Sequence, residues 1–168
     1  AAAETATTAA AAASSPADLP SLLRLCSSLH TLTLFRTDSL DDAAMGPILR
    51  SCPLLRQLTL TRQRLVNPPI ISATLVRLTF IECEQLHSPT VDCPRLREFH
   101  LRATEQLRSP TIRSAALRAL SLADCSQLSS AALECQSLLD LDLSACTALA
   151  AEHVQQLLAC CPRLLSLR

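Results

Sequence analysis

The chain has 168 residues, with 15 basic and 15 acidic side chains and a formal net charge of zero. This balance provides no basic surface for nucleic acid, and the absence of Tyr and Trp removes the usual platforms for base stacking. No apolar run approaches the ~18 residues that a membrane span requires, so we expect no membrane partner. Because 49% of the residues are hydrophobic, a sizeable core is possible.

The first residues differ in composition from the rest. Residues 1–16 are mostly Ala, Thr and Ser without an amphipathic period, which is typical of a disordered tail. Asp18 followed by Pro20 predicts a short capped helix that ends near Leu25. We assign residues 17–168 to one domain. The chain begins with Ala and ends inside a repeated phrase, so we expect a fragment of a longer protein, truncated at its C-terminal end.

One phrase recurs seven times along this domain. In its clearest copy, residues 93–101, Leu96 lies three residues before Phe99, and Leu101 follows two residues later. The alternation of Phe99 and Leu101 with polar residues is typical of a half-buried strand. Successive first leucines are 26, 20, 21, 21, 21 and 26 residues apart by subtraction of their numbers. Such a period predicts short units that bury one another's apolar edges by stacking. The first leucines are Leu29, Leu55, Leu75, Leu96, Leu117, Leu138 and Leu164.

The segments between the phrases fall into two kinds. The two 26-residue steps have room for outer helices at residues 41–50 and 151–159. The shorter steps are rich in Pro and carry an apolar residue two positions before each Cys or Ser, which predicts extended outer segments in the middle repeats. The apolar residues expected to point inward are Ala44, Ile48 and Leu49, then Ile70, Val91, Ile112 and Leu133, and finally Val154, Leu157 and Leu158.

Eight of the nine cysteines occupy two columns of the repeat. An odd number at repeat-locked positions argues against disulfides, and a zinc site needs four converging ligands that these columns do not supply. We therefore interpret them as buried free thiols of a reducing compartment, cytoplasmic or nuclear, and expect no metal and no other cofactor. The columns are Cys26, Cys52, Cys93, Cys135 and Cys161, and Cys83, Cys125 and Cys146.

The pattern Leu-x-x-Leu-x-Leu, with a Cys column and Cys-Pro-x-Leu before the next strand, resembles the leucine-rich repeat over residues 22–168. The Cys column resembles the cysteine-containing class typical of F-box/leucine-rich-repeat proteins. This resemblance implies an α/β solenoid, a horseshoe with a parallel concave sheet. It also implies the substrate-recognition repeats of an SCF-type E3 ubiquitin ligase, in which a separate F-box binds Skp1 and cullin. No F-box occurs in this chain, so Skp1 and cullin are expected partners only through an F-box outside it.

Strand alternation predicts three exposed residues per repeat on the concave face. Exposed apolar side chains and unpaired charges on a rigid sheet suit the docking of a protein substrate. We therefore interpret the chain as a protein-interaction module rather than an enzyme. The candidate partner-binding residues are Phe35, Arg77, Ile81, Glu98, His100, Arg102, Asp140 and Asp142.

Two other classes of function stay open beside this one. A general scaffold or signalling adaptor would use the same face without a ligase role. A repeat-built regulator of small GTPases would need a catalytic Arg on a loop with acidic neighbours, and we identify none. A catalytic triad of His100, Ser121 and Asp142 is excluded, because Ser121 lies on the middle strand and His100 is about two strand spacings, ~9.6 Å, from Asp142.

Overall fold

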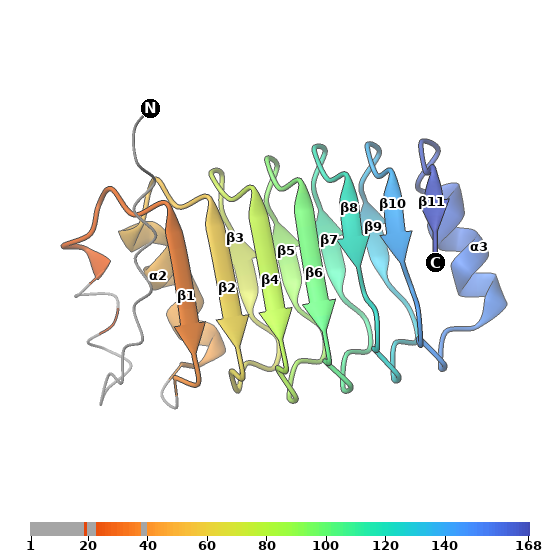
Figure 1. The fold of residues 1–168 in the computed structure, drawn as a ribbon, viewed down its shortest axis with the longest axis horizontal. Coiled ribbons are helices and arrows are strands. Elements are labelled where there is room, and N and C mark those ends of the chain that lie inside the picture. Colours follow the sequence, from red (N-terminus) through yellow and green to blue (C-terminus); the bar gives the residue numbers. More distant parts are fainter. Residues whose placement is uncertain (1–18, 20–22, 38–39) are drawn as a thin grey trace.

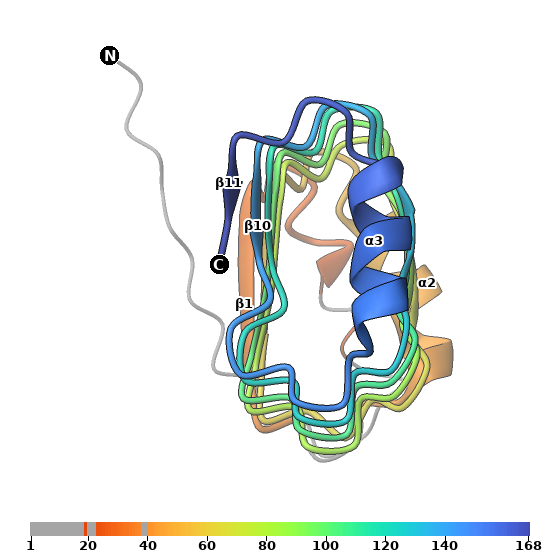
Figure 2. The same cartoon turned by 90° about the vertical axis from the view of Figure 1, so that its right-hand side faces the viewer.

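A computed structural model describes residue 19, residues 23–37 and residues 40–168. The expected tail, residues 1–16, and the beginning of the helix expected over residues 18–25 lie outside the described residues. Within them the chain winds as a solenoid with two parallel sheets on opposite sides (Figures 1 and 2). The prediction of a repeat solenoid with parallel strands is confirmed.

The larger sheet has seven parallel strands that follow one another in chain order. Each repeated phrase contributes one strand, because the alternating leucines of the phrase bury one side and leave the other exposed. The strands are β1 (Thr31–Phe35), β2 (Gln57–Thr61), β4 (Arg77–Ile81), β6 (Glu98–Arg102), β8 (Ala119–Ser121), β10 (Asp140–Asp142) and β11 (Ser166–Leu167).

The opposite side of the solenoid follows the predicted division into helices and extended segments. The middle repeats form a second sheet, and one helix lies at each end of the molecule (Figure 1). Asp41 begins the first helix by accepting a hydrogen bond from the Ala44 amide (2.9 Å), and the helix continues through Pro47. The elements are α2 (Asp42–Ser51), β3 (Pro69–Ile71), β5 (Thr90–Asp92), β7 (Thr111–Arg113), β9 (Ala132–Glu134) and α3 (Ala151–Ala159).

The core between the two sheets consists of apolar columns. Leu58, Leu78, Phe99 and Leu120 pair directly across neighbouring strands, as the repeat predicts. All four are buried, and the rings of Phe80 and Phe99 lie with their centroids 6.0 Å apart. On the other side, Ile70, Val91, Ile112 and Leu133 form the matching column of the second sheet. Each repeat is therefore covered by the next one.

A column of buried polar side chains closes each turn after the seven-stranded sheet. Gln63 donates to the Leu34 carbonyl (3.1 Å), and Cys83 donates to the Leu60 carbonyl (3.5 Å), each one repeat back. The buried side chains thus have their own donors satisfied by main-chain oxygens of the preceding repeat. Burial raises the pKa of the Cys125 thiol to about 11 and that of Cys93 to about 12, which keeps both thiols protonated and unreactive near neutral pH.

Burial decreases at both ends of the described stack. The prediction that the Cys columns are buried is wrong for Cys26, which is exposed, and holds only in part for Cys146, which is half-buried. Leu165 and Leu167 are 82% and 46% exposed at the opposite end. The helix prediction also omitted Met45, which is fully buried beneath α2.

Among the described residues, six non-glycine residues adopt positive φ. Each lies in the turn that follows a strand of the seven-stranded sheet. Their φ angles lie between 46° and 61°, in the left-handed region that L-residues adopt only at a cost. The turn therefore carries the same backbone strain in each of the first six repeats. The residues are Arg36, Arg62, Glu82, Ala103, Asp124 and Ala145.

Replacing Ala103 with Gly should stabilise the fold by about 0.5–1 kcal/mol, because glycine adopts φ 51° without strain and the exposed methyl group contributes little packing. Urea unfolding followed by circular dichroism measures the change. The matched control is Ala132→Gly in β9, where the same substitution should destabilise. An Ala103→Gly variant no more stable than the wild type would contradict this account of the turn.

Candidate binding face

The exposed side of the seven-stranded sheet, called here the binding face, carries all eight candidate residues. Direct pairing places Arg77 beside Glu98 and places His100, Ser121 and Asp142 in one row across three strands. The predicted columns of exposed residues are therefore confirmed. Ser121 lies between the other two, as predicted, so the row is not a catalytic triad.

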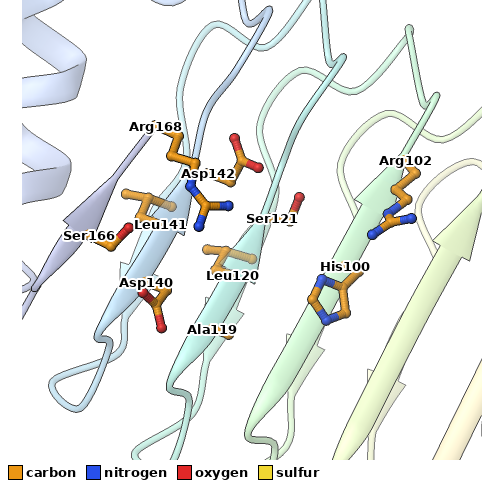
Figure 3. Close-up of a pocket in the computed structure, with 10 residues that line it drawn as sticks. All are labelled: His100, Arg102, Ala119, Leu120, Ser121, Asp140, Leu141, Asp142, Ser166 and Arg168. Carbon is orange, nitrogen blue, oxygen red and sulfur yellow. The ribbon is translucent and has the colours of Figure 1, made fainter.

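A shallow hollow of ≈ 160 Å³ lies in the C-terminal part of the binding face (Figure 3). Its floor is strand β8, where Ala119 and Ser121 are too small to fill the space between the longer side chains of β6 and β10. The hollow brings together four of the eight candidates and adds Ser166 of β11 and Arg168, which follows that strand. Its lining residues are His100, Arg102, Ala119, Leu120, Ser121, Asp140, Leu141, Asp142, Ser166 and Arg168.

The other four candidates lie outside this hollow. Phe35 is 52% exposed on β1 and has the Arg62 guanidinium 5.7 Å from its ring centroid, an arrangement favourable for a cation–π interaction. Ile81 is half-buried on β4, so it offers less apolar surface than the sequence predicts. The binding face therefore has an apolar corner at its N-terminal end and a charged hollow at its C-terminal end.

Arg77 and Glu98 correct the expectation of unpaired charge. Two bonds join them, from Arg77 Nε to Glu98 Oε2 (2.7 Å) and from Arg77 Nη2 to Glu98 Oε1 (3.2 Å). The hydrogen bond from Arg77 holds the pKa of Glu98 below its usual range, and the same bond raises the pKa of Arg77. The two residues occupy neighbouring positions of one column, so the register that predicted the column also predicts this contact.

His100 forms the β6 wall of the hollow as a neutral imidazole. Burial lowers the pKa of His100, and Arg102 and Arg77 lower it further, whereas the Glu98 carboxylate opposes the shift. The Nε2 atom lies 4.0 Å from Glu98 Oε2, and the Nδ1 atom has no hydrogen-bond partner within the described residues. Because Nδ1 is itself buried, Nε2 is the ring nitrogen that a bound partner could reach.

Asp142 forms the opposite wall as a fixed carboxylate. The Ser144 hydroxyl and the Ser144 amide (3.0 Å) both donate to its Oδ1. The hydroxyl bond is the main cause of the lowered pKa of Asp142, and the amide bond, Arg168 and Arg102 add to it. Asp140 lies two residues earlier on the same strand and is exposed. The hollow thus has carboxylates on the β10 wall and arginines at its β6 and β11 sides.

Sequence reasoning missed the small residues, Ser166 and Arg168 as parts of the hollow. Ala119 carries neither charge nor a large apolar group, and Ser121 was considered only for the excluded catalytic triad. The usable signal was their position, since two small residues stand between the charged rows of β6 and β10 in the same columns. Arg168 was not among the predicted binding residues.

Within the described residues, no group of three or more His, Cys, Asp or Glu side chains is placed to hold a metal ion. Searching the same residues, we find no helix with the length and apolar character needed to cross a membrane. Comparisons of the chain with protein-family models, with curated proteins and with solved structures give no match.

The pKa of His100 should lie below the usual value of ~6.5, as an NMR titration of the imidazole resonances measures. Glu98→Gln should lower it further, because a charge that favours the imidazolium is removed. Arg102→Gln should raise it, because a repelling charge is removed. Shifts in the opposite directions would contradict this description of the hollow.

Acidification should destabilise the folded chain through the His100 imidazole. Because the folded state disfavours the charged imidazole, the unfolded chain takes up the proton first as the pH falls through ~6.5. The contribution of His100 to stability is therefore complete above that pH and declines as the pH falls toward the lower pKa of the folded state. Denaturant titrations should show a smaller loss for His100→Gln over this interval than for the wild type.

Proposed function

We propose that the chain is a leucine-rich-repeat module whose binding face docks a protein partner. The repeat identity is supported by steps of 20–26 residues, by the buried leucine columns and by the polar column that bonds the carbonyls of the preceding repeat. The outer segments of the middle repeats are strands rather than helices, which changes the outer side of the solenoid and leaves the opposite sheet intact.

The observation that carries the docking proposal is the continuity of the binding face. Seven strands in direct register present one surface that has an exposed Phe35 at one end and a hollow with fixed charges at the other. Rigid sheets with a few apolar and charged anchors suit protein recognition, because little conformational entropy is lost when they bind. The fixed Asp142 carboxylate and the neutral His100 would supply specificity through hydrogen bonds.

The cysteine-containing repeat pattern supports a narrower proposal, that this face is the substrate-recognition part of an SCF-type E3 ubiquitin ligase of the F-box/leucine-rich-repeat type. In that role the repeats bind the substrate, and an F-box outside this chain contacts Skp1 and cullin. The alternative is a scaffold or signalling adaptor that uses the same face with no ubiquitin ligation.

Ala119→Arg should abolish partner binding, because a long charged side chain would fill the hollow from its floor. The matched control is Ala132→Arg, which places the same side chain on the exposed side of β9 in the opposite sheet. The experiment expresses the full-length protein with each variant and quantifies co-purified proteins by mass spectrometry. Partners lost from Ala119→Arg alone would support docking on the binding face, and equal losses from both variants would contradict it.

The ligase proposal needs a separate readout from the same purifications. Skp1 and cullin should co-purify with the wild type and with both variants, because an F-box would bind them away from the repeats. A full-length protein that retains its binding-face partners but never carries Skp1 would exclude the ligase role and leave the adaptor role.

A further inference from the structure

Exposed arginines of this solenoid are repeatedly neutralised by the repeat that follows. Arg62 bonds Glu82, Arg77 bonds Glu98 and Arg113 bonds Glu134, and the partners are 20 or 21 residues apart. In each case the acid occupies the neighbouring position of the stack. The fold thus has a regular way to pair a basic side chain with an acidic one.

Arg97 breaks this arrangement. The Arg118 amide donates to the Arg97 carbonyl (2.9 Å), so the residue at the neighbouring position of the stack is a second arginine. Both side chains are exposed, and neither forms an ion pair with any described residue. Like charges at neighbouring positions of parallel strands destabilise the stack by repulsion. Arg36 and Arg62 are also neighbours in the turn column, but there Glu82 bonds Arg62. Arg97 and Arg118 have no such acidic partner among the described residues.

These two arginines line a hollow of ≈ 340 Å³ in the loops that lead into β8, β10 and β11. Arg163 forms a third basic wall, and the small side chains of Ala116 and Ser137 leave the space open. No acidic residue lines this hollow, although the whole chain carries as many acidic as basic side chains. The lining residues are Arg97, Ala116, Arg118, Ser137, Leu139 and Arg163.

The charge balance distinguishes this hollow from a comparable one at the other end of the strands. Three arginines, Arg36, Arg62 and Arg64, also line that second hollow, but Glu82 and Glu84 line it with them. Acidic residues of the same lining can therefore neutralise a cluster of arginines in this fold. The lining of the hollow at Arg97 contains no acidic residue.

We propose that the hollow formed by Arg97, Arg118 and Arg163 binds a phosphate dianion. Guanidinium groups present paired N–H donors that match phosphate oxygens, and three of them around one space can engage the oxygens of a single phosphate. The Ser137 hydroxyl is a further donor in the same lining. The phosphate supplies the negative charge that the neighbouring repeats do not, and it relieves the repulsion between Arg97 and Arg118. This site lies beside the binding face and does not depend on the partner proposed for that face.

The test is titration of the protein with inorganic phosphate by isothermal calorimetry, at an ionic strength held constant with chloride. Wild type should bind phosphate at one site per chain. Arg97→Gln/Arg118→Gln should weaken binding by about tenfold or more, because two charge-assisted contacts are lost. The matched control, Arg62→Gln/Arg113→Gln, has the same change in net charge and should keep the wild-type affinity.

Thermal unfolding by circular dichroism provides a second readout. Phosphate should raise the melting temperature of the wild type and of the control, and not that of Arg97→Gln/Arg118→Gln. In phosphate-free, low-salt buffer the latter variant should melt no lower than the wild type, because a repulsion has been removed, which shows that lost binding is not lost folding. Absence of binding to the wild type, or equal affinity in all three proteins, would overturn the proposal.

Two sources of the phosphate are separated by a further titration with a short phosphoserine peptide and its unmodified counterpart. Tighter binding of the phosphopeptide than of inorganic phosphate would assign the site to a phosphate carried on a polypeptide, and equal or weaker binding would assign it to a small soluble phosphate. Either result, with loss in Arg97→Gln/Arg118→Gln, supports the site. Equal binding of both peptides would overturn it.

Discussion

The mutual burial of neighbouring repeats is the interaction on which the whole structure depends. One repeat has a single apolar edge that cannot be buried within the repeat itself, so its leucines leave water only when the next repeat lies against them. Direct pairing of Leu58, Leu78, Phe99 and Leu120 across neighbouring strands is the visible result. This burial sets the spacing and register of the strands, and these in turn determine which surface residues are neighbours.

The same register organises the surface. Alternation in a strand sends one set of side chains into the core and the other set outward, so residues one repeat apart become neighbours on the binding face. Arg77 meets Glu98, and small residues of β8 leave a hollow between the charged rows of β6 and β10. The outward residues contribute to the stack only through exposed pairs such as Arg77–Glu98, so most of their chemistry is free to serve recognition.

The sequence predicted those parts of the structure that follow from periodicity. Strand register, the extended outer segments of the middle repeats and both helices could be derived because leucine spacing and proline placement determine them locally. That the extended segments pair into a second sheet was not predicted. The hollow at Ala119, the turn strain at Ala103 and the exposure of Cys26 could not be derived. The hollow depends on how far particular side chains reach, and the turn strain depends on backbone angles that composition does not mark.

A double-mutant cycle on Phe80→Leu and Phe99→Leu tests the dependence between neighbours most directly. The two rings touch across β4 and β6, so their effects on the free energy of unfolding should be coupled by about 0.5 kcal/mol or more. Leu32→Val on β1 and Phe99→Leu, separated by two intervening strands, should be additive. Additivity in the adjacent pair, or equal coupling in both pairs, would contradict an account in which each repeat is stabilised by the one beside it.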